Sequence, residues 1–273
     1  MLKEIIRMLV NRQPRAYYFH HIPKTAGTTL NAALLDIFAP DQICPPWVWH
    51  QLLKYEKQSL KQFQLFRGHF YAALEPFLGF PVRSFAFLRD PKERALSHYG
   101  HVMRAPQHYL HEKAVKLQTF EAFLQDPETR ETVSNFQAKC LVSAFDPRVL
   151  AAGLTAMELE NFELERQIET AASMMTPEHL LNEARSALHR FECICITERF
   201  NDSLKLLGKT FKWDFKNYRQ PENQNLQRTR IEDLSSKETT LLHELNTIDI
   251  HLYNEAKFTF HKSVCALPKA FAV

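Results

Sequence analysis

The sequence predicts an α/β fold in which strands alternate with helices. Twice, a short apolar segment typical of a strand leads through a polar loop into a helix, first after residues 16–19 and again after residues 83–88. The chain of 273 residues is long enough to bury a sizeable core and has the length of one α/β domain. We therefore expect a single domain over residues 1–273, with an N-terminal extension over residues 1–15.

The composition is that of an ordinary globular protein. Hydrophobic residues make up 45% of the chain and charged residues 24%. The formal net charge of +3 is too small to indicate a nucleic-acid binder, although it is compatible with local basic sites for an anionic ligand. We therefore expect no nucleic-acid partner.

Cysteine usage and the N-terminal segment predict a cytoplasmic protein. The five cysteines are odd in number and form no paired framework, which favours a reducing compartment. Lys3, Glu4 and Arg7 interrupt residues 1–10, so this segment is too short and too charged for a membrane span or a signal peptide. We expect no membrane span and a soluble, cytoplasmic location.

The first strand-to-helix junction has the chemistry of an anion-binding loop. After the strand at residues 16–19, the chain reads His-His-Ile-Pro-Lys-Thr-Ala-Gly-Thr-Thr over residues 20–29. Apolar residues then recur at helical spacing from Leu30 to Phe38. The N–H groups of a first helical turn point at a bound anion, and the helix dipole favours negative charge there. The junction therefore predicts an anion cradle.

The side chains of this loop suit the same purpose. Lys24 supplies a full positive charge, and Gly27 lets the backbone approach a ligand closely. Hydroxyl donors come from Thr25, Thr28 and Thr29. The loop differs from the nucleoside-triphosphate loop G-x-x-x-x-G-K-[ST], because Lys24 precedes the only glycine.

The second junction follows the predicted strand at residues 83–88. Asp90 is a good N-cap, a proline occupies the first helical position, and Glu93 is expected to complete a capping box back to Asp90. Arg89 therefore leaves the carboxyl end of a strand, where ligands bind in open α/β sheets, and Ser97 lies about two turns into the helix. A guanidinium offers a planar fork for a phosphate, and a hydroxyl can take a remaining oxygen.

The rest of the chain continues the alternation without repeats. Residues 63–66 and 191–196 are typical of strands, and the second strand places Cys193 and Cys195 on one face as buried thiols. Apolar periodicity and cap-like residues predict helices over residues 47–63, 119–125, 131–142, 155–172, 177–191 and 236–260.

Both junctions resemble segments of the carbohydrate sulfotransferase family that includes heparan sulfate 2-O-sulfotransferase. Pro-Lys-Thr-Ala-Gly-Thr-Thr over residues 23–29 is similar to the 5′-phosphosulfate loop of that family, and Arg-Asp-Pro-x-x-Arg-x-x-Ser-x-Tyr over residues 89–99 is similar to its 3′-phosphate segment. The resemblance extends over residues 17–260. It implies a three-layer, P-loop-like sandwich with a mainly parallel central sheet flanked by helices, and a helical acceptor-side insertion over residues 105–190.

The resemblance also implies a donor, 3′-phosphoadenosine-5′-phosphosulfate (PAPS), and a role for each loop. Arg89 and Ser97 would hold the 3′-phosphate of PAPS. Lys24 would neutralise the charge that builds on the departing oxygen, so no metal would be needed. The residues implied to bind the 5′-phosphosulfate are Lys24, Thr25, Ala26, Gly27, Thr28 and Thr29.

A candidate base lies between the two junctions, in Phe-Arg-Gly-His over residues 66–69. This segment resembles a His-Gly-His pattern of the family, whose second histidine is regarded as the base. His69 matches that histidine, and a neutral imidazole can take a proton from an attacking hydroxyl. Arg67 replaces the first histidine of the pattern, and we expect it to contact an acidic acceptor sugar.

Three further residues are expected to touch substrates. The sequence Asn-Phe-Gln-Ala-Lys over residues 135–139 resembles an Asn-x-Gln-x-Arg element of the family, and we expect Asn135 to contact the acceptor. Arg228 and Arg230 belong to a polar loop that could cover the adenosine end of the donor. The predicted acceptor is a hydroxyl of a carbohydrate or glycolipid. The sequence predicts no oligomeric state.

Two other functions remain open at this point. One is an ATP-dependent kinase, which is disfavoured by the order of the loop and by Arg89 with Ser97, since these suit a 3′-phosphate that ATP lacks. The other is a non-catalytic nucleotide- or carbohydrate-binding protein, which is disfavoured by the presence of both Lys24 and His69.

Two histidine pairs also occur at helical spacing. They are His98 with His101, and His108 with His111. Such pairs can be metal ligands, exposed helix faces or acceptor contacts. No cysteine or carboxylate completes a recognisable ligand set, so we expect no metal here.

Overall fold

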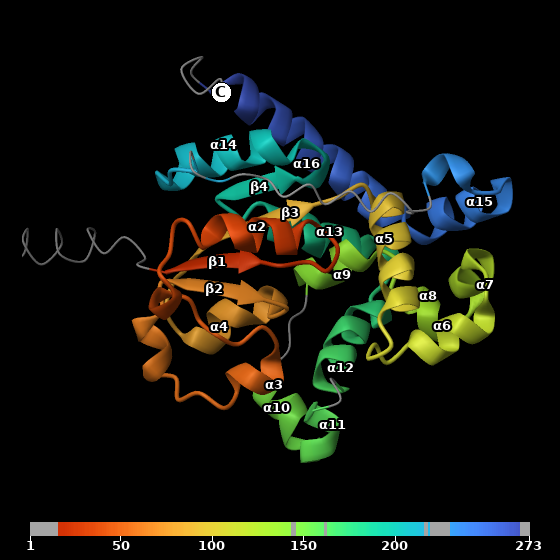
Figure 1. The fold of residues 1–273 in the computed structure, drawn as a ribbon, viewed down its shortest axis with the longest axis horizontal. Coiled ribbons are helices and arrows are strands. Elements are labelled where there is room, and N and C mark those ends of the chain that lie inside the picture. Colours follow the sequence, from red (N-terminus) through yellow and green to blue (C-terminus); the bar gives the residue numbers. More distant parts are fainter. Residues whose placement is uncertain (1–15, 143–145, 161–162, 216–217, 219–229, 268–273) are drawn as a thin grey trace, which may run out of the picture.

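A four-stranded sheet forms the centre of the molecule (Figure 1). The computed structural model describes residues 16–142, 146–160, 163–215, 218 and 230–267. The strands are β1 (Tyr17–His20), β2 (Leu65–Gly68), β3 (Arg83–Leu88) and β4 (Cys193–Ile196). Their order is β2-β1-β3-β4, and each neighbouring pair is parallel. The predicted α/β fold with a parallel central sheet is therefore confirmed.

The helices divide between the first and the second half of the chain. The first half contains α2 (Gly27–Leu34), α3 (Trp49–Leu52), α4 (Leu74–Leu78), α5 (Pro91–Arg104), α6 (His111–Leu117), α7 (Phe120–Gln125) and α8 (Pro127–Glu131). The second half contains α9 (Phe136–Val142), α10 (Pro147–Ala152), α11 (Ala156–Glu160), α12 (Glu163–Ala171), α13 (Pro177–Leu188), α14 (Phe200–Phe211), α15 (Ser236–Leu245) and α16 (Thr247–Cys265).

Helices cover both faces of the sheet, which gives three layers. Successive side chains of a strand point to opposite faces. On one face, the ring of Tyr17 packs edge-on against Phe211 of α14, with ring centroids 5.4 Å apart. On the other face, His20 Nε2 lies 3.0 Å from the carbonyl oxygen of Cys140 on α9, and α13 packs against α9. The predicted three-layer architecture is confirmed.

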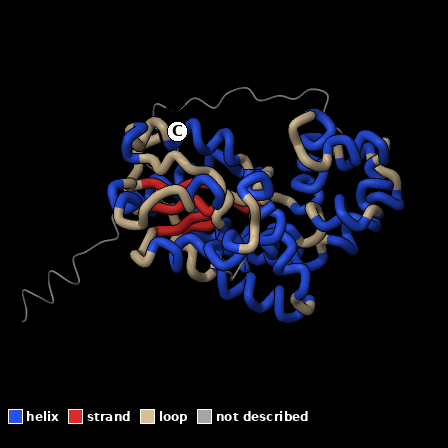
Figure 2. Tube along the Cα trace, turned by 90° about the horizontal axis from the view of Figure 1, so that it is seen from below, coloured by secondary structure: helices blue, strands red, loops and turns tan. Residues whose placement is uncertain are grey.

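A second, smaller core lies to one side of the sheet. It is built from α5, α6, α7 and α15, and its buried members include Leu96, Phe123 and Leu242. Figure 1 and Figure 2 show this helical lobe at the right, beyond the strands. Since β1 runs toward α5 in Figure 1, the carboxyl ends of the parallel strands face the helix that joins the two cores.

The segment at residues 105–190 contributes to both parts of the molecule. Helix α6 and helix α7 belong to the second core. Helix α9 and helix α13 instead contribute buried residues to the main core around the sheet. The described residues of the segment are largely helical. Two of its helices form part of a layer on the central sheet, so its role as an acceptor-side insertion stays a prediction.

Several predicted elements have different bounds in the structure. The second strand is Leu65–Gly68 rather than residues 63–66. The predicted helix over residues 47–63 is wrong, because only Trp49–Leu52 is α-helical there, followed by a 3-10 turn at Ser59–Gln62. Trp49, Leu52 and Leu60 are fully buried, so core packing rather than a continuous helix accounts for their spacing.

Two predicted helices are interrupted by asparagines. Asn135 has a left-handed backbone with φ of 44°, which separates α8 from α9 within the predicted helix 131–142. Asn246 separates α15 from α16, and its side-chain amide donates to the carbonyl of Leu242 at 3.0 Å. By contrast, the predicted helices over residues 119–125 and 177–191 begin at N-caps, Thr119 and Thr176, whose side chains accept backbone hydrogen bonds.

No helix in the described ranges is both long enough and apolar enough to cross a lipid bilayer.

Candidate active site

The loop between β1 and α2 is held in an unusual backbone conformation. Lys24 and Ala26 both adopt the left-handed region, with φ of 72° and 66°. Thr25 between them is fully buried, and its hydroxyl donates to the carbonyl of Ile22 at 2.8 Å. Left-handed conformations are costly for residues with a side chain, so the surrounding packing must hold them. Backbone turns of this kind form concave nests of N–H groups that bind anions.

The start of α2 lies directly against an imidazole ring. A Cβ atom on Gly27 would come within 1.8 Å of His21 Nε2, so only glycine fits at this position. The N-cap of α2 is Ala26, which offers no side-chain acceptor to the first-turn N–H groups. These groups therefore stay available to an anion. Thr28 is exposed and Thr29 half-buried at the same helix end.

Lys24 sits in a strongly positive environment. Burial, together with the smaller effect of the charges of Arg89, Arg104 and Arg94, lowers the pKa of its ammonium group to about 8. The negative charge of a bound anion would raise the pKa of Lys24 again. Such an environment favours a ligand with several negative charges.

The second junction meets the first at Arg89. Its Nη1 donates to the carbonyl of Lys24 at 3.1 Å, and its Nη2 donates to Glu93 at the same distance. Burial lowers the pKa of this guanidinium. Because β1 and β3 are neighbours in the sheet, the two predicted phosphate-binding segments are side by side at its carboxyl edge.

The helix start after Arg89 differs from the prediction in one detail. Asp90 caps α5 by accepting from the backbone N–H groups of Lys92 and Glu93, as expected. The capping box is wrong, since the backbone N–H of Asp90 donates to Glu198 rather than to Glu93. The carboxylate of Glu93 is occupied by Arg89 instead.

Ser97 is half-buried on α5, two turns beyond the start of that helix. Arg230 is exposed, and its backbone N–H donates to Asp233 at 3.0 Å. Arg228 lies outside the described residues. The expected contacts of these three residues with the donor remain predictions.

His69 follows β2 and is fixed by hydrogen bonds. Its Nδ1 lies 3.0 Å from the carbonyl oxygen of His21, and its ring stacks on the ring of His21 with centroids 4.6 Å apart. A carbonyl only accepts, so Nδ1 carries the proton and Nε2 of the neutral ring holds a free lone pair. Burial lowers the pKa of His69 to about 4.

The backbone before His69 is equally constrained. Gly68 has φ of 150°, and a Cβ there would come within 2.3 Å of the carbonyl oxygen of Trp47. The backbone N–H of His69 donates to that same carbonyl at 2.8 Å. The segment around Trp47 therefore positions the candidate base.

Arg67 lies in β2, beside the candidate base. Its guanidinium stacks over the ring of Trp47 at 4.5 Å, and its Nη1 donates to Asn31 at 3.3 Å. Its buried Nε has no hydrogen-bond partner among the described residues. The stacking on Trp47 could not be predicted from the sequence, because strand β2 and the segment before α3 meet only in the tertiary fold.

Asn135 contacts the start of α16, whereas Gln137 contacts the backbone of Arg89. The side-chain oxygen of Asn135 accepts from the backbone N–H groups of Ile248 and Asp249, and so caps α16. Gln137 donates to the carbonyl of Arg89 at 2.9 Å and accepts from its N–H at 3.0 Å. Gln137 is thus a positioning residue that the sequence interpretation missed, although the Asn-x-Gln-x-Arg resemblance included it.

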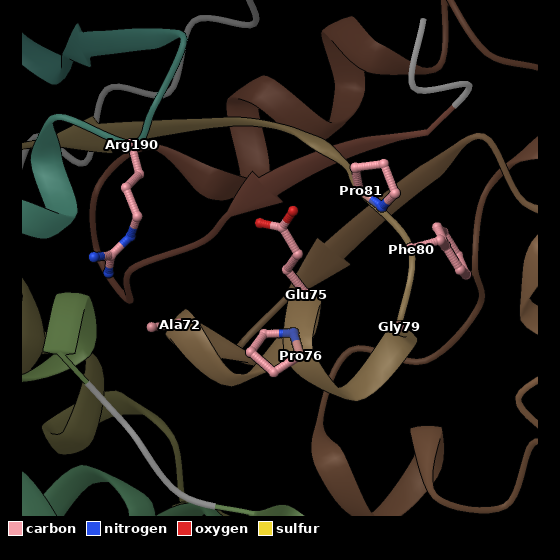
Figure 3. Close-up of a pocket in the computed structure, with 7 residues that line it drawn as sticks. All are labelled: Ala72, Glu75, Pro76, Gly79, Phe80, Pro81 and Arg190. Carbon is pink, nitrogen blue, oxygen red and sulfur yellow. The ribbon is translucent and has the colours of Figure 1, made fainter. Parts of the chain in front are cut away.

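A hollow of about 510 Å³ lies elsewhere in the molecule (Figure 3). Glu75 and Arg190 contribute its charged side chains, and Phe80 and Pro81 precede β3. It contains none of the predicted site residues. Its residues lie before β3 and β4, at the amino ends of those strands, so it is separate from the edge where the two junctions meet.

Three adjacent strands therefore bring a lysine loop, an arginine and an oriented histidine to one edge of a parallel sheet. This arrangement is that of an α/β protein with a candidate anion-binding site at the carboxyl edge of its sheet. The sequence model of the Sulfotransferase family matches residues 7–256, so the chain belongs to the sulfotransferase family. The match supports the family and not its heparan sulfate 2-O-specific member. A search of curated proteins found no match.

Proposed function

We propose that this sulfotransferase moves a sulfuryl group from PAPS to a hydroxyl of a carbohydrate or glycolipid. The observation that carries the proposal is the hydrogen bond from Arg89 to the carbonyl of Lys24. It joins the two segments that resemble the 3′-phosphate and 5′-phosphosulfate sites, so one nucleotide can span both. The surroundings of Lys24 favour a multiply charged anion of this kind.

The donor would be held by backbone and side chains of both junctions. The N–H groups at the start of α2 would bind the 5′-phosphosulfate, together with Lys24. Arg89 would bind the 3′-phosphate with Ser97, and the phosphate would compete with Glu93 for the guanidinium. The buried hydroxyl of Thr25 would hold the loop in shape, since it is bonded to Ile22.

The transfer itself needs a base and a stabilised leaving group. The acceptor oxygen attacks sulfur while the bond from sulfur to the bridging oxygen breaks. His69 Nε2 takes the hydroxyl proton, because Nδ1 already donates to His21. Lys24 neutralises the negative charge that develops on the 5′-phosphate of the nucleotide product.

Calorimetry with two nucleotides tests this proposal. We expect 3′,5′-diphosphoadenosine (PAP) to bind about a hundredfold more tightly than ATP with Mg²⁺, because only PAP fills both phosphate sites. Transfer of radiolabelled sulfate from PAPS to a glycan mixture should follow. Tighter binding of ATP with Mg²⁺ would favour a kinase, and PAP binding without transfer to any glycan or glycolipid would favour a non-catalytic binder.

A further inference from the structure

Three histidines lie together within range of the charge of Lys24. His98 and His101 belong to α5, and His108 follows that helix. The ring centroid of His108 is 5.7 Å from that of His98 and also 5.7 Å from that of His101. The charge of Lys24 acts on all three imidazoles. We call these three residues the histidine cluster.

His98 is buried without a polar partner. Its side chain is 7% exposed, and neither Nδ1 nor Nε2 has a hydrogen-bond partner among the described residues. A neutral imidazole carries one N–H donor in either tautomer. Leaving a buried donor unpaired costs free energy, and a ligand that accepts a hydrogen bond would remove this cost.

His108 presents a donor of defined position. The backbone N–H of Leu110 donates to His108 Nδ1 at 3.1 Å. Nδ1 is therefore the unprotonated nitrogen of the neutral ring, so Nε2 carries the proton. Since His108 is only half-buried, this second donor can be reached by a ligand.

The electrostatic surroundings of the histidine cluster are positive. Burial and the charges of Lys24, Arg94 and Arg104 all lower the pKa values within the cluster. No carboxylate of the described residues is among the groups that act on them. Nor does any group of three or more metal-binding side chains in the described ranges suit a metal ion. Donors in a positive field select an anion.

A small hollow of about 190 Å³ is lined by two aromatic rings that contact the cluster. Phe136 lines it and stacks on His98, with ring centroids 6.5 Å apart. Tyr109 also lines it and stacks on His108 at 4.8 Å. Its charged side chains are Glu128, Glu131 and Arg166, and both glutamates are held in ion pairs, with Lys113 and Lys139. The three histidines do not line the hollow itself.

We propose that the histidine cluster is a subsite for an acidic group of the acceptor, a carboxylate or a sulfate ester. His98 and His108 donate hydrogen bonds to this anion, and Lys24 adds its charge. The inference rests on the proposed function for one point only, which is that Lys24 marks the position of the sulfuryl group. The acceptor sugar would then carry its acidic group close to the hydroxyl that is sulfated.

Binding of a minimal anion tests the cluster independently of catalysis. Inorganic sulfate is titrated into the PAP-saturated protein while the histidine ring nitrogens are followed by NMR. The ring signals of His98 and His108 should shift together and saturate, whereas those of the exposed His251 should not. Unchanged His98 and His108 signals, or equal shifts of all exposed histidines, would overturn the proposal.

A matched pair of sugars then tests the acceptor. The probes are a glucuronate-containing tetrasaccharide and its carboxyl-reduced counterpart, with binding to the PAP-saturated protein measured by calorimetry. The acidic sugar should bind about tenfold more tightly, because it gains at least one charge-assisted hydrogen bond that the carboxyl-reduced sugar cannot form. His98→Phe and His108→Gln should each abolish this preference, and His251→Gln should retain it. Equal binding of both sugars to the parent protein would contradict the subsite.

The outcomes separate this inference from the proposed function. If PAP does not bind but sulfate still shifts the cluster signals, the donor assignment fails while the anion subsite stands. If PAP binds and is weakened about tenfold by His98→Phe, the cluster belongs to the donor site and the subsite proposal is wrong. The conservative His108→Gln variant keeps the test valid should His98→Phe fail to fold.

Discussion

Gln137 holds the backbone of Arg89 from both sides, through one donated and one accepted hydrogen bond. The side chain is 2% exposed, so water does not replace these bonds easily. Gln137 lies on α9, and the start of α9 is itself fixed by the buried carboxylate of Asp249. The position of Arg89 at the sheet edge therefore depends on elements far away in the sequence.

We expect Gln137→Ala to weaken PAP binding about tenfold. Loss of two hydrogen bonds of about 1 kcal/mol each releases the backbone that aims the Arg89 guanidinium. Calorimetry with PAP measures the effect. Gln42→Ala is the matched control, because Gln42 accepts one backbone hydrogen bond from Ala39 outside the site. An unchanged Kd in Gln137→Ala would show that Arg89 is held by other contacts.

Lys24→Ala should lower the turnover number about a hundredfold or more, with a smaller effect on PAP affinity. Its charge matters most when the bridging oxygen becomes negative, and removal of one such stabilising group costs about this much in rate. Steady-state assays of sulfate transfer, combined with PAP calorimetry, separate the two effects. Transfer by Lys24→Ala at the parental rate would refute the proposed role of Lys24.

The pH dependence of kcat/KM should reveal the ammonium group of Lys24. The pKa of Lys24 in the free enzyme is lowered to about 8, so the positive charge is present below this pH and lost above it. Since kcat/KM reports groups of the free enzyme, it should fall above pH 8. In Lys24→Arg the guanidinium keeps its charge, so this alkaline limb should disappear. Identical alkaline limbs in both proteins would assign the limb to another group.

His69→Ala should reduce transfer by about a hundredfold or more while PAP binds as before. The pKa of His69 is lowered to about 4, so the parent enzyme keeps a neutral base throughout pH 5 to 8. Transfer assays and PAP calorimetry give the two readouts, with the exposed His251→Ala as the control. If His69→Ala lost PAP affinity in proportion to its rate, His69 would be a donor-binding residue instead.

Local signals in the sequence predicted the parts of the site that depend on neighbouring residues. The strand at residues 83–88 has the predicted bounds, and Asp90 caps α5 as expected. Short-range caps and apolar runs determine such features. The left-handed loop at Lys24 lies at the predicted strand-to-helix junction, and its role as an anion cradle stays a prediction.

Contacts between distant residues could not be predicted in this way. Asn135 caps α16 and Asp249 caps α9, although the two residues are 114 positions apart. Only the tertiary fold brings these helix ends together, and the left-handed backbone of Asn135 is part of that junction. The role expected for Asn135 as an acceptor contact stays a prediction. Its side-chain oxygen accepts two backbone hydrogen bonds at the start of α16.

His20 makes the stability of the fold beneath the site depend on pH. His20 is 2% exposed at the end of β1, and burial lowers its pKa to about 3 in the folded protein, from 6.5 in an unfolded chain. Between these two pH values the unfolded state binds one proton more, so stability falls as the pH is lowered from 6.5 toward 3. The free energy of unfolding therefore changes with pH, and removing the imidazole of His20 should reduce the slope of this dependence by about 1.4 kcal/mol per pH unit near pH 5. The variant His20→Gln keeps a donor toward the carbonyl of Cys140 but cannot titrate. Urea unfolding of His20→Gln, the parent and an exposed control, His251→Gln, at several pH values measures the three slopes. Parallel slopes for His20→Gln and the parent would mean that His20 is protonated equally in both states, contrary to its burial against α9.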